Sequence, residues 1–287
     1  MEYLFLALSI SLSTVRTLLS KKLSRIEFGN KEFYIFQAII FFTGSASLCI
    51  FGKPFPFYPS PMLFYAVIYG ILLILAQWMY TAALSCGNTA LCSTVYSMGF
   101  IIPTISGALF WSEKLNLFDI IGIVFAVLAL IFSGKSKSNE KRIESGKYFI
   151  PLFISMLSAG GLGLMQKLQQ KSDFSDQRGG FLLFSFIIAG LISLIFSFIK
   201  KNNAIKKSDK SSYFSAISVG FSFGCCNILN TLLAGILPSA PFFPVLNIGV
   251  ILTTTFISII FMKEKTERKD YSVLICGILS IVFLTVL

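Results

Sequence analysis

The sequence contains no histidine and few charged residues. Without an imidazole, the chain cannot use a Ser-His triad, a histidine-ligated zinc ion or a histidine general base. Charged residues make up 13% of the 287 residues, about half of the roughly 25% that a soluble domain carries. Hydrophobic residues make up 55%, and Phe alone occurs 31 times, which excludes a disordered chain. The composition predicts an integral membrane protein.

Cysteines and acids give no sign of a metal or redox site. The six cysteines lie in or at the ends of apolar stretches, and none forms a C-x-x-C pair. We interpret them as small buried hydrophobic side chains. An enzyme acting on lipid phosphates usually needs clustered acids for Mg²⁺, and the sequence holds no such cluster. We therefore expect no enzymatic activity, no metal and no cofactor.

Apolar stretches long enough to cross a bilayer recur along the whole chain. A transmembrane helix needs about 20 apolar residues. Ten segments fit, at residues 2–20, 33–52, 62–85, 89–111, 117–134, 147–168, 180–199, 212–236, 239–262 and 271–287. The connections hold nearly all the charge, and the Pro-rich segment 53–61 is an obvious break. The sequence predicts an all-α protein with ten transmembrane helices and no soluble domain.

Basic residues are distributed unequally between the connections. Of the 24 Lys and Arg residues, 18 follow predicted spans 1, 5, 7 and 9, and 5 follow spans 2, 4, 6 and 8. The positive-inside rule then places the first group in the cytoplasm and both termini outside. It also explains the net charge of +11 without a nucleic-acid partner. A signal peptide has its basic residues first, whereas here they follow span 1, so we expect a retained helix.

The two halves of the chain show an internal repeat. A shift of 151 residues overlays 104–132 on 255–283 without a gap, and a shift of 145 relates predicted spans 1 and 6. The matched charged pairs are Glu113/Glu264, Lys114/Lys265, Asp119/Asp270 and Lys22/Lys167. We expect a five-helix repeat over 1–134, a linker over 135–146 and a second repeat over 147–287. Because five is odd, the second repeat is inverted, as in many secondary transporters.

One motif carries a family resemblance. Segment 109–115 (LFWSEKL) ends the fourth span, Gly122 follows, and segment 261–265 (FMKEK) repeats the motif. With these segments and its ten-helix pattern, the chain resembles the EamA-like family of the drug/metabolite transporter superfamily. In the second half, Val273 replaces the glycine. Members of that family more often keep both termini in the cytoplasm, opposite to the charge distribution found here.

Acidic residues are absent from the centres of the predicted spans, and Arg16 is the one charge well inside a span. Small multidrug exporters of the superfamily bind protons and cationic drugs with a helix-1 carboxylate, which is lacking here. Arg16 has two interpretations. It either snorkels to the membrane surface or provides a fixed cation at the floor of a substrate cavity, suited to a carboxylate or phosphate.

Polar and aromatic side chains recur at matched positions of the two halves. At a shift of 150, Gln77 pairs with Asn227 and Tyr80 with Asn230, each set spaced i, i+3 on one helix face. They either line a cavity or form hydrogen bonds between helices. Tyr96 and Asn247 hold equivalent positions in predicted helices 4 and 9, and Trp78 is adjacent to Gln77. The substrate-binding candidates are therefore Arg16, Gln77, Trp78, Tyr80, Tyr96, Asn227, Asn230 and Asn247.

Charged residues at the predicted helix ends form a second group, with a structural or gating role: Glu113, Glu264, Lys22 and Lys167. Gly220, Gly224 and the Gly-rich segment 158–163 are expected to be close-packing helix faces. Pro103 is expected to kink its helix.

These patterns predict a secondary transporter of a small polar metabolite, such as an amino acid or organic acid, working by alternating access in a bacterial plasma membrane. An exporter of amines or drugs on the same fold is the alternative, followed by a channel or lipid flippase. The expected partners are a small-molecule substrate and the lipid bilayer, with the chain as a monomer or homodimer.

Overall fold

A computed structural model describes residues 1–23, 28–53, 59–86, 95–134, 149–200, 210–260 and 268–285. In these ranges every regular element is helical. The helices are α1 (Glu2–Leu23), α2 (Lys31–Phe51), α3 (Pro59–Cys86), α5 (Ile101–Trp111), α6 (Leu117–Gly134), α7 (Phe149–Lys171), α8 (Arg178–Ile199), α9 (Lys210–Ile236), α10 (Ser239–Ile260) and α11 (Arg268–Thr285), with 3-10 turns η1 (Met98–Phe100) and η2 (Ser175–Gln177). The prediction of an all-helical chain is confirmed for these residues.

Length and hydropathy identify the helices that can cross a membrane. Seven described helices qualify outright, and three shorter apolar helices cover Val95–Trp111, Leu117–Phe132 and Tyr271–Thr285. These ten segments coincide with the ten predicted from the sequence to within a few residues at most ends. The protein is a multi-pass membrane protein. The predicted linker 135–146 lies outside the described residues.

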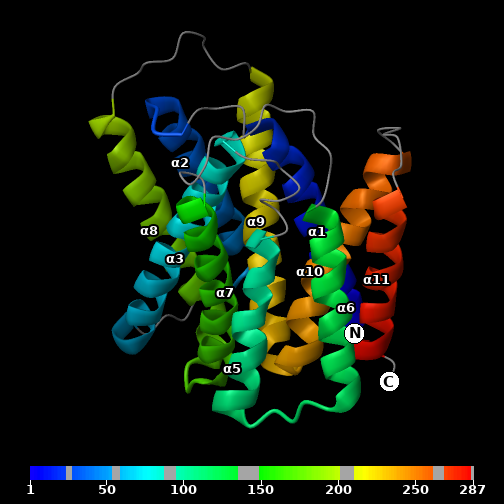
Figure 1. Ribbon diagram of the computed structural model, residues 1–287. Helices are drawn as coiled ribbons and strands as arrows, with labels where there is room; N and C mark the ends of the chain where they lie inside the picture. The colour runs from blue at the N-terminus through cyan, green and yellow to red at the C-terminus, as the bar shows by residue number, and fades with distance from the viewer. Residues whose placement is uncertain are drawn as a thin grey trace.

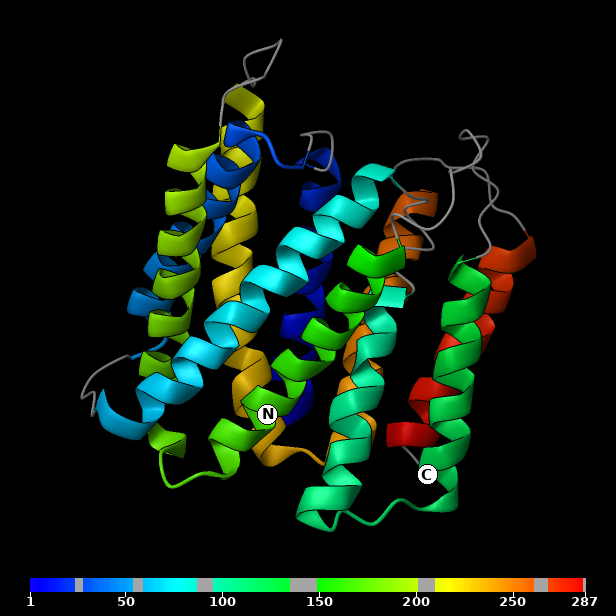
Figure 2. The ribbon, with the colours of Figure 1, turned by 60° about the vertical axis from the view of Figure 1, so that its left-hand side comes forward.

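Successive helices run in alternating directions, and both chain ends lie at the same end of the bundle (Figures 1 and 2). Helices from the two halves of the chain pack against each other in matched pairs. Helix α1 packs on α9 and α7 packs on α3, while α2 contacts α8 and α6 contacts α11. The middle of the bundle is therefore bounded by helices of both halves.

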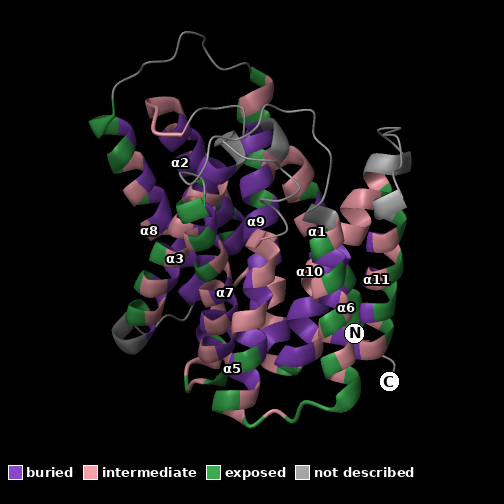
Figure 3. Ribbon diagram, in the orientation of Figure 1, coloured by how far each residue is buried: buried purple, intermediate pink, exposed green. Residues whose placement is uncertain are grey.

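Burial divides the molecule into an interior and an apolar outer surface (Figure 3). One core cluster, rich in aromatic side chains, lies mainly between α2, α3, α8 and α9, and a second lies mainly between α6, α9, α10 and α11. Large hydrophobic side chains are also exposed on the outer faces, among them Leu109, Phe110, Phe198 and Phe214. An outer surface of this kind is suited to contact with lipid.

Glycines allow the central helices to approach closely. A Cβ at Gly224 would lie 2.5 Å from the Gly44 carbonyl oxygen, so α2 and α9 pack backbone to backbone here. A Cβ at Gly160 would lie equally close to the carbonyl oxygen of Gly99. The predicted glycine packing faces on α7 and α9 are confirmed at these positions. They bring the polar residues of neighbouring helices within reach of each other.

The helix that contains Pro103 changes geometry near that residue. A 3-10 turn occupies Met98–Phe100, and α-helical geometry begins at Ile101. Proline has no N–H to donate to the carbonyl four residues earlier, which belongs to Gly99. The irregular turn therefore falls where the helix lacks a regular backbone hydrogen bond.

Candidate functional site

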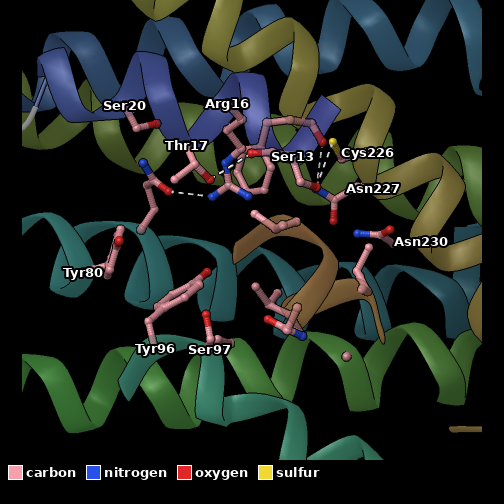
Figure 4. A pocket seen from close by; sticks show the side chains of 18 of the residues that line it. Ser13, Arg16, Thr17, Ser20, Tyr80, Tyr96, Ser97, Cys226, Asn227 and Asn230 are labelled. Atoms are coloured by element: carbon pink, nitrogen blue, oxygen red, sulfur yellow. Dashed lines mark hydrogen bonds between the residues drawn. The ribbon is translucent and has the colours of Figure 1, made fainter. Parts of the chain in front are cut away.

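A cavity of about 350 Å³ lies between the helices of both halves. Residues of α1, α2, α3, α7, α9, α10 and the helix Val95–Trp111 line it. Seven of the eight substrate-binding candidates share this cavity: Arg16, Gln77, Tyr80, Tyr96, Asn227, Asn230 and Asn247. Figure 4 shows Arg16 on one wall, Tyr80, Tyr96 and Ser97 on the opposite wall, and Asn227 and Asn230 to one side.

Arg16 projects into the cavity from α1 (Figure 4). Its Nη2 donates a hydrogen bond to Gln77 Oε1 at 3.0 Å, and its Cζ lies 3.6 Å from the centroid of the Phe223 ring. The ring face attracts a cation, and the amide accepts one of the five guanidinium donors. Both contacts hold the side chain in place, and neither Gln77 nor Phe223 neutralises its positive charge.

A hydrogen-bonded network of three side chains joins α3, α7 and α9 beside the cavity. Tyr69 donates to Asn227 Oδ1 at 2.5 Å, and Gln166 Nε2 donates to the Tyr69 hydroxyl at 2.8 Å and to Asn227 Oδ1 at 3.1 Å. All three side chains are buried and line the cavity. Sequence reasoning missed Tyr69 and Gln166, although both are polar groups within predicted spans.

Two hydrogen bonds in the cavity occupy corresponding places in the halves. The bonds Arg16–Gln77 and Gln166–Asn227 each join residues 61 positions apart. The shift of 150 that pairs Gln77 with Asn227 also pairs Arg16 with Gln166. The shift of 150 could therefore identify Gln166 from the sequence, whereas the shift of 145 aligns Arg16 with Gly161.

The remaining cavity candidates provide hydroxyl and amide groups. Asn230 Oδ1 accepts a hydrogen bond from Ser9 at 2.5 Å, and Asn247 Nδ2 donates to the Phe243 carbonyl at 2.9 Å. The rings of Tyr80 and Tyr96 pack with their centroids 4.5 Å apart. These contacts leave the cavity wall rich in neutral groups that donate and accept hydrogen bonds.

Gln37 of α2 is a further polar group that sequence reasoning missed. It lines the cavity, is 4% exposed, and its Oε1 has no hydrogen-bond partner among the described residues. A buried acceptor without a partner is costly, at about 1–3 kcal/mol. The oxygen itself is buried, so a molecule in the cavity does not reach it in this conformation, and Gln37 lines the cavity with its other atoms.

Trp78 is the one substrate-binding candidate that does not line the cavity. It is buried in an aromatic cluster, with ring centroids 4.9 Å from Tyr34, 5.1 Å from Phe196 and 6.4 Å from Phe33. Neighbouring residues on an α-helix point about 100° apart. Trp78 therefore faces away from the cavity that its neighbour Gln77 lines.

The cavity carries positive charge and no negative charge within the part of the chain that is described. Arg16 is the charged residue among those that line it, and none of the described acids does. A charged Arg at the centre of a membrane helix costs about 2.5–3.5 kcal/mol. Nor do three or more Cys, Asp or Glu side chains gather as metal ligands among the described residues.

The buried Lys167 and the half-buried Glu113 form an ion pair away from the cavity. Lys167 Nζ lies 2.6 Å from Glu113 Oε1 and donates to the Leu237 carbonyl at 3.1 Å, and the second Glu113 oxygen accepts the Ser239 N–H at 2.7 Å. The pair joins α7 to the α5–α6 connection and to the start of α10. Burial alone would raise the pKa of Glu113, but the hydrogen bonds from Lys167 and Ser239 lower it.

The corresponding candidates in the sequence repeat are Lys22 and Glu264. The side chain of Lys22 and all of Glu264 lie outside the part that the structure describes. Their predicted role stays a prediction.

The fold and the cavity define a class: a multi-pass helical membrane protein with a polar central cavity. The family model described as Sugar transport protein matches residues 117–287. That range is more than half of the chain, which therefore belongs to this family and is a membrane transporter of small substrates.

Solved structures share the fold. Twenty-eight solved chains match, and one crystal structure superposes with a TM-score of 0.77 at 12% sequence identity, over 99% of this chain and 96% of its own. None of the curated proteins compared matches. At this identity, the structural likeness shows the fold and not the substrate.

Proposed function

We propose that the protein is a secondary transporter that carries a small hydroxylated solute of the carbohydrate class across the plasma membrane by alternating access. The observation that carries the proposal is the cavity, which is enclosed by helices of both halves and lined by neutral hydroxyl and amide groups. Such groups both donate to and accept from the hydroxyls of a sugar. The family description, Sugar transport protein, supports the same substrate class.

We propose further that the two halves, 1–134 and 147–287, are inverted repeats of the EamA-like type. The matched contacts of α1 with α9 and of α7 with α3 support this, as do the two hydrogen bonds of equal sequence separation. Inverted repeats can exchange their two conformations, which moves the opening of a central site from one side to the other.

The Glu113–Lys167 pair has a place in this cycle. It ties α7 to the connection between α9 and α10. If these segments separate when the cavity opens toward this end, the ion pair must break. We propose that it stabilises the state in which this end is closed.

The amine exporter is the weaker candidate, because none of the described residues lining the cavity is an acid. A cationic amine would meet Arg16 without a compensating carboxylate. A channel differs from a transporter in a measurable property, because it shows no counterflow.

The test is counterflow of radiolabelled D-glucose in proteoliposomes, with Gln166→Leu and Gln170→Leu as matched variants. Gln166 lines the cavity, whereas Gln170, one helical turn later, does not. We expect wild type and Gln170→Leu to show saturable counterflow and Gln166→Leu to show a weakened apparent affinity. Flux without counterflow in the wild type, or no carbohydrate flux at all, would contradict the proposal.

A further inference from the structure

Among the described residues, Lys167 and Arg16 are cations that face the interior, and their surroundings differ. Lys167 is 1% exposed and meets the carboxylate of Glu113. Arg16 lines the cavity and meets an amide oxygen and an aromatic ring, with no described acid on the cavity wall. Where a buried cation is structural, this chain supplies an acid for it. The charge of Arg16 is therefore available to a molecule that enters the cavity.

The guanidinium is arranged to receive an anion. Its fork of five donors matches a carboxylate in a bidentate geometry, and one described acceptor, Gln77, takes one of these donors. Phe223 supports one face of the group and fixes its plane. The side chain is therefore held at the wall of the cavity, and its remaining N–H donors are available to a bound anion.

Resting on the proposed transport of carbohydrates, we propose that the substrate is a sugar acid with a single carboxylate, bound by Arg16. One guanidinium balances one carboxylate. A phosphate monoester carries a charge of about −1.5 to −2 at neutral pH, which a single cation would leave partly unbalanced. The hydroxyl and amide groups of Tyr80, Tyr96 and Asn247 line the same cavity and are suited to the hydroxyls of the sugar ring.

The experiment compares D-glucuronate with D-glucose, which differ by a carboxylate in place of a hydroxymethyl group. Binding to purified protein and counterflow in proteoliposomes are measured for wild type, Arg16→Gln, Arg16→Lys and Lys171→Gln. Lys171→Gln is the matched control, because it removes one positive charge from an exposed site outside the cavity. Thermal unfolding of each variant without solute shows that it is folded.

We expect the wild type and Lys171→Gln to bind glucuronate at least about tenfold more tightly than glucose, since hydrogen bonds to a charged group are strong. Arg16→Gln loses this preference, because the carboxylate no longer meets a guanidinium. Arg16→Lys keeps part of the preference, because the charge remains and the fork is lost.

Equal binding of the two solutes by the wild type would overturn the inference, as would an Arg16→Gln variant that keeps the preference or loses both solutes equally. If glucose is transported and glucuronate is not, the inference fails and the proposed function stands. If neither is transported, both fail.

Discussion

The ion pair of Glu113 and Lys167 allows a quantitative prediction. Lys167 Nζ is almost completely buried and has two oxygen partners in the structure, the Glu113 carboxylate at 2.6 Å and the Leu237 carbonyl at 3.1 Å. Glu113→Gln keeps the shape of the side chain and removes its charge. It leaves a buried cation without its counterion, which costs about 3–5 kcal/mol in comparable cases. At about 2 °C per kcal/mol, this predicts a loss of about 6–10 °C in Tm.

The reciprocal variant is expected to be milder. Lys167→Met fills the same space with an apolar chain and leaves Glu113, which is 18% exposed and can be reached by water. We expect a loss of about 1–3 kcal/mol. The double variant has neither charge, so its loss should be smaller than the sum of the single losses by about 0.5–3 kcal/mol.

The assay is thermal unfolding of detergent-purified protein, followed by the fraction that stays monodisperse after heating. Lys171→Met is the matched control, one turn further along the same helix and exposed, with an expected change within about 0.5 kcal/mol. The reasoning is refuted if Glu113→Gln lowers Tm no more than Lys171→Met, or if the two single losses add fully in the double variant.

Three further predictions concern acid, packing and the aromatic cluster. The folded-state pKa of Glu113 is lowered. Its stabilising effect is therefore present above the unfolded value of about 4.3 and is lost as pH falls through the folded value. In unfolding scans against pH, the Tm of the wild type should fall more steeply over this acid range than the Tm of Glu113→Gln. Gly224→Ala should lower the unfolding free energy by about 1–3 kcal/mol through overpacking. Gly161→Ala should be tolerated, because its Cβ meets only the flexible end of the Leu72 side chain. Thermal unfolding of the two variants compares these effects. Trp78→Phe should lower Tm without changing substrate affinity, measured by binding, and a weaker affinity would place Trp78 in the site after all.

The helices and their packing faces follow from local patterns, which is why they are predictable. A run of about 20 apolar residues must form a helix in lipid, because each backbone polar group needs an internal partner. Gly224 and Gly160 lie in small-residue segments of the sequence, and the structure places both at close helix contacts. These features depend on nearest neighbours along the chain and not on the tertiary arrangement.

The direction in which a single polar side chain points is harder to predict from the sequence. Trp78 was grouped with Gln77 because the two are adjacent, but a step of one residue turns the side chain by about 100°. Tyr69 and Gln166 contact Asn227 across sequence separations of 158 and 61 residues. Their role depends on which helices meet, and the composition of a single helix does not contain that information.

The polar groups of the interior differ in whether their partners lie within the protein. Tyr69, Gln166 and Asn227 satisfy one another, and Lys167 is satisfied by Glu113. Such groups hold helices together, and a ligand that took their place would have to compensate the bonds it broke. Arg16 differs, because no acid among the described residues of the cavity wall compensates its charge. A solute that supplies an anion gains an interaction with Arg16 without displacing this network, so selectivity should be set by Arg16 more than by the larger network beside it.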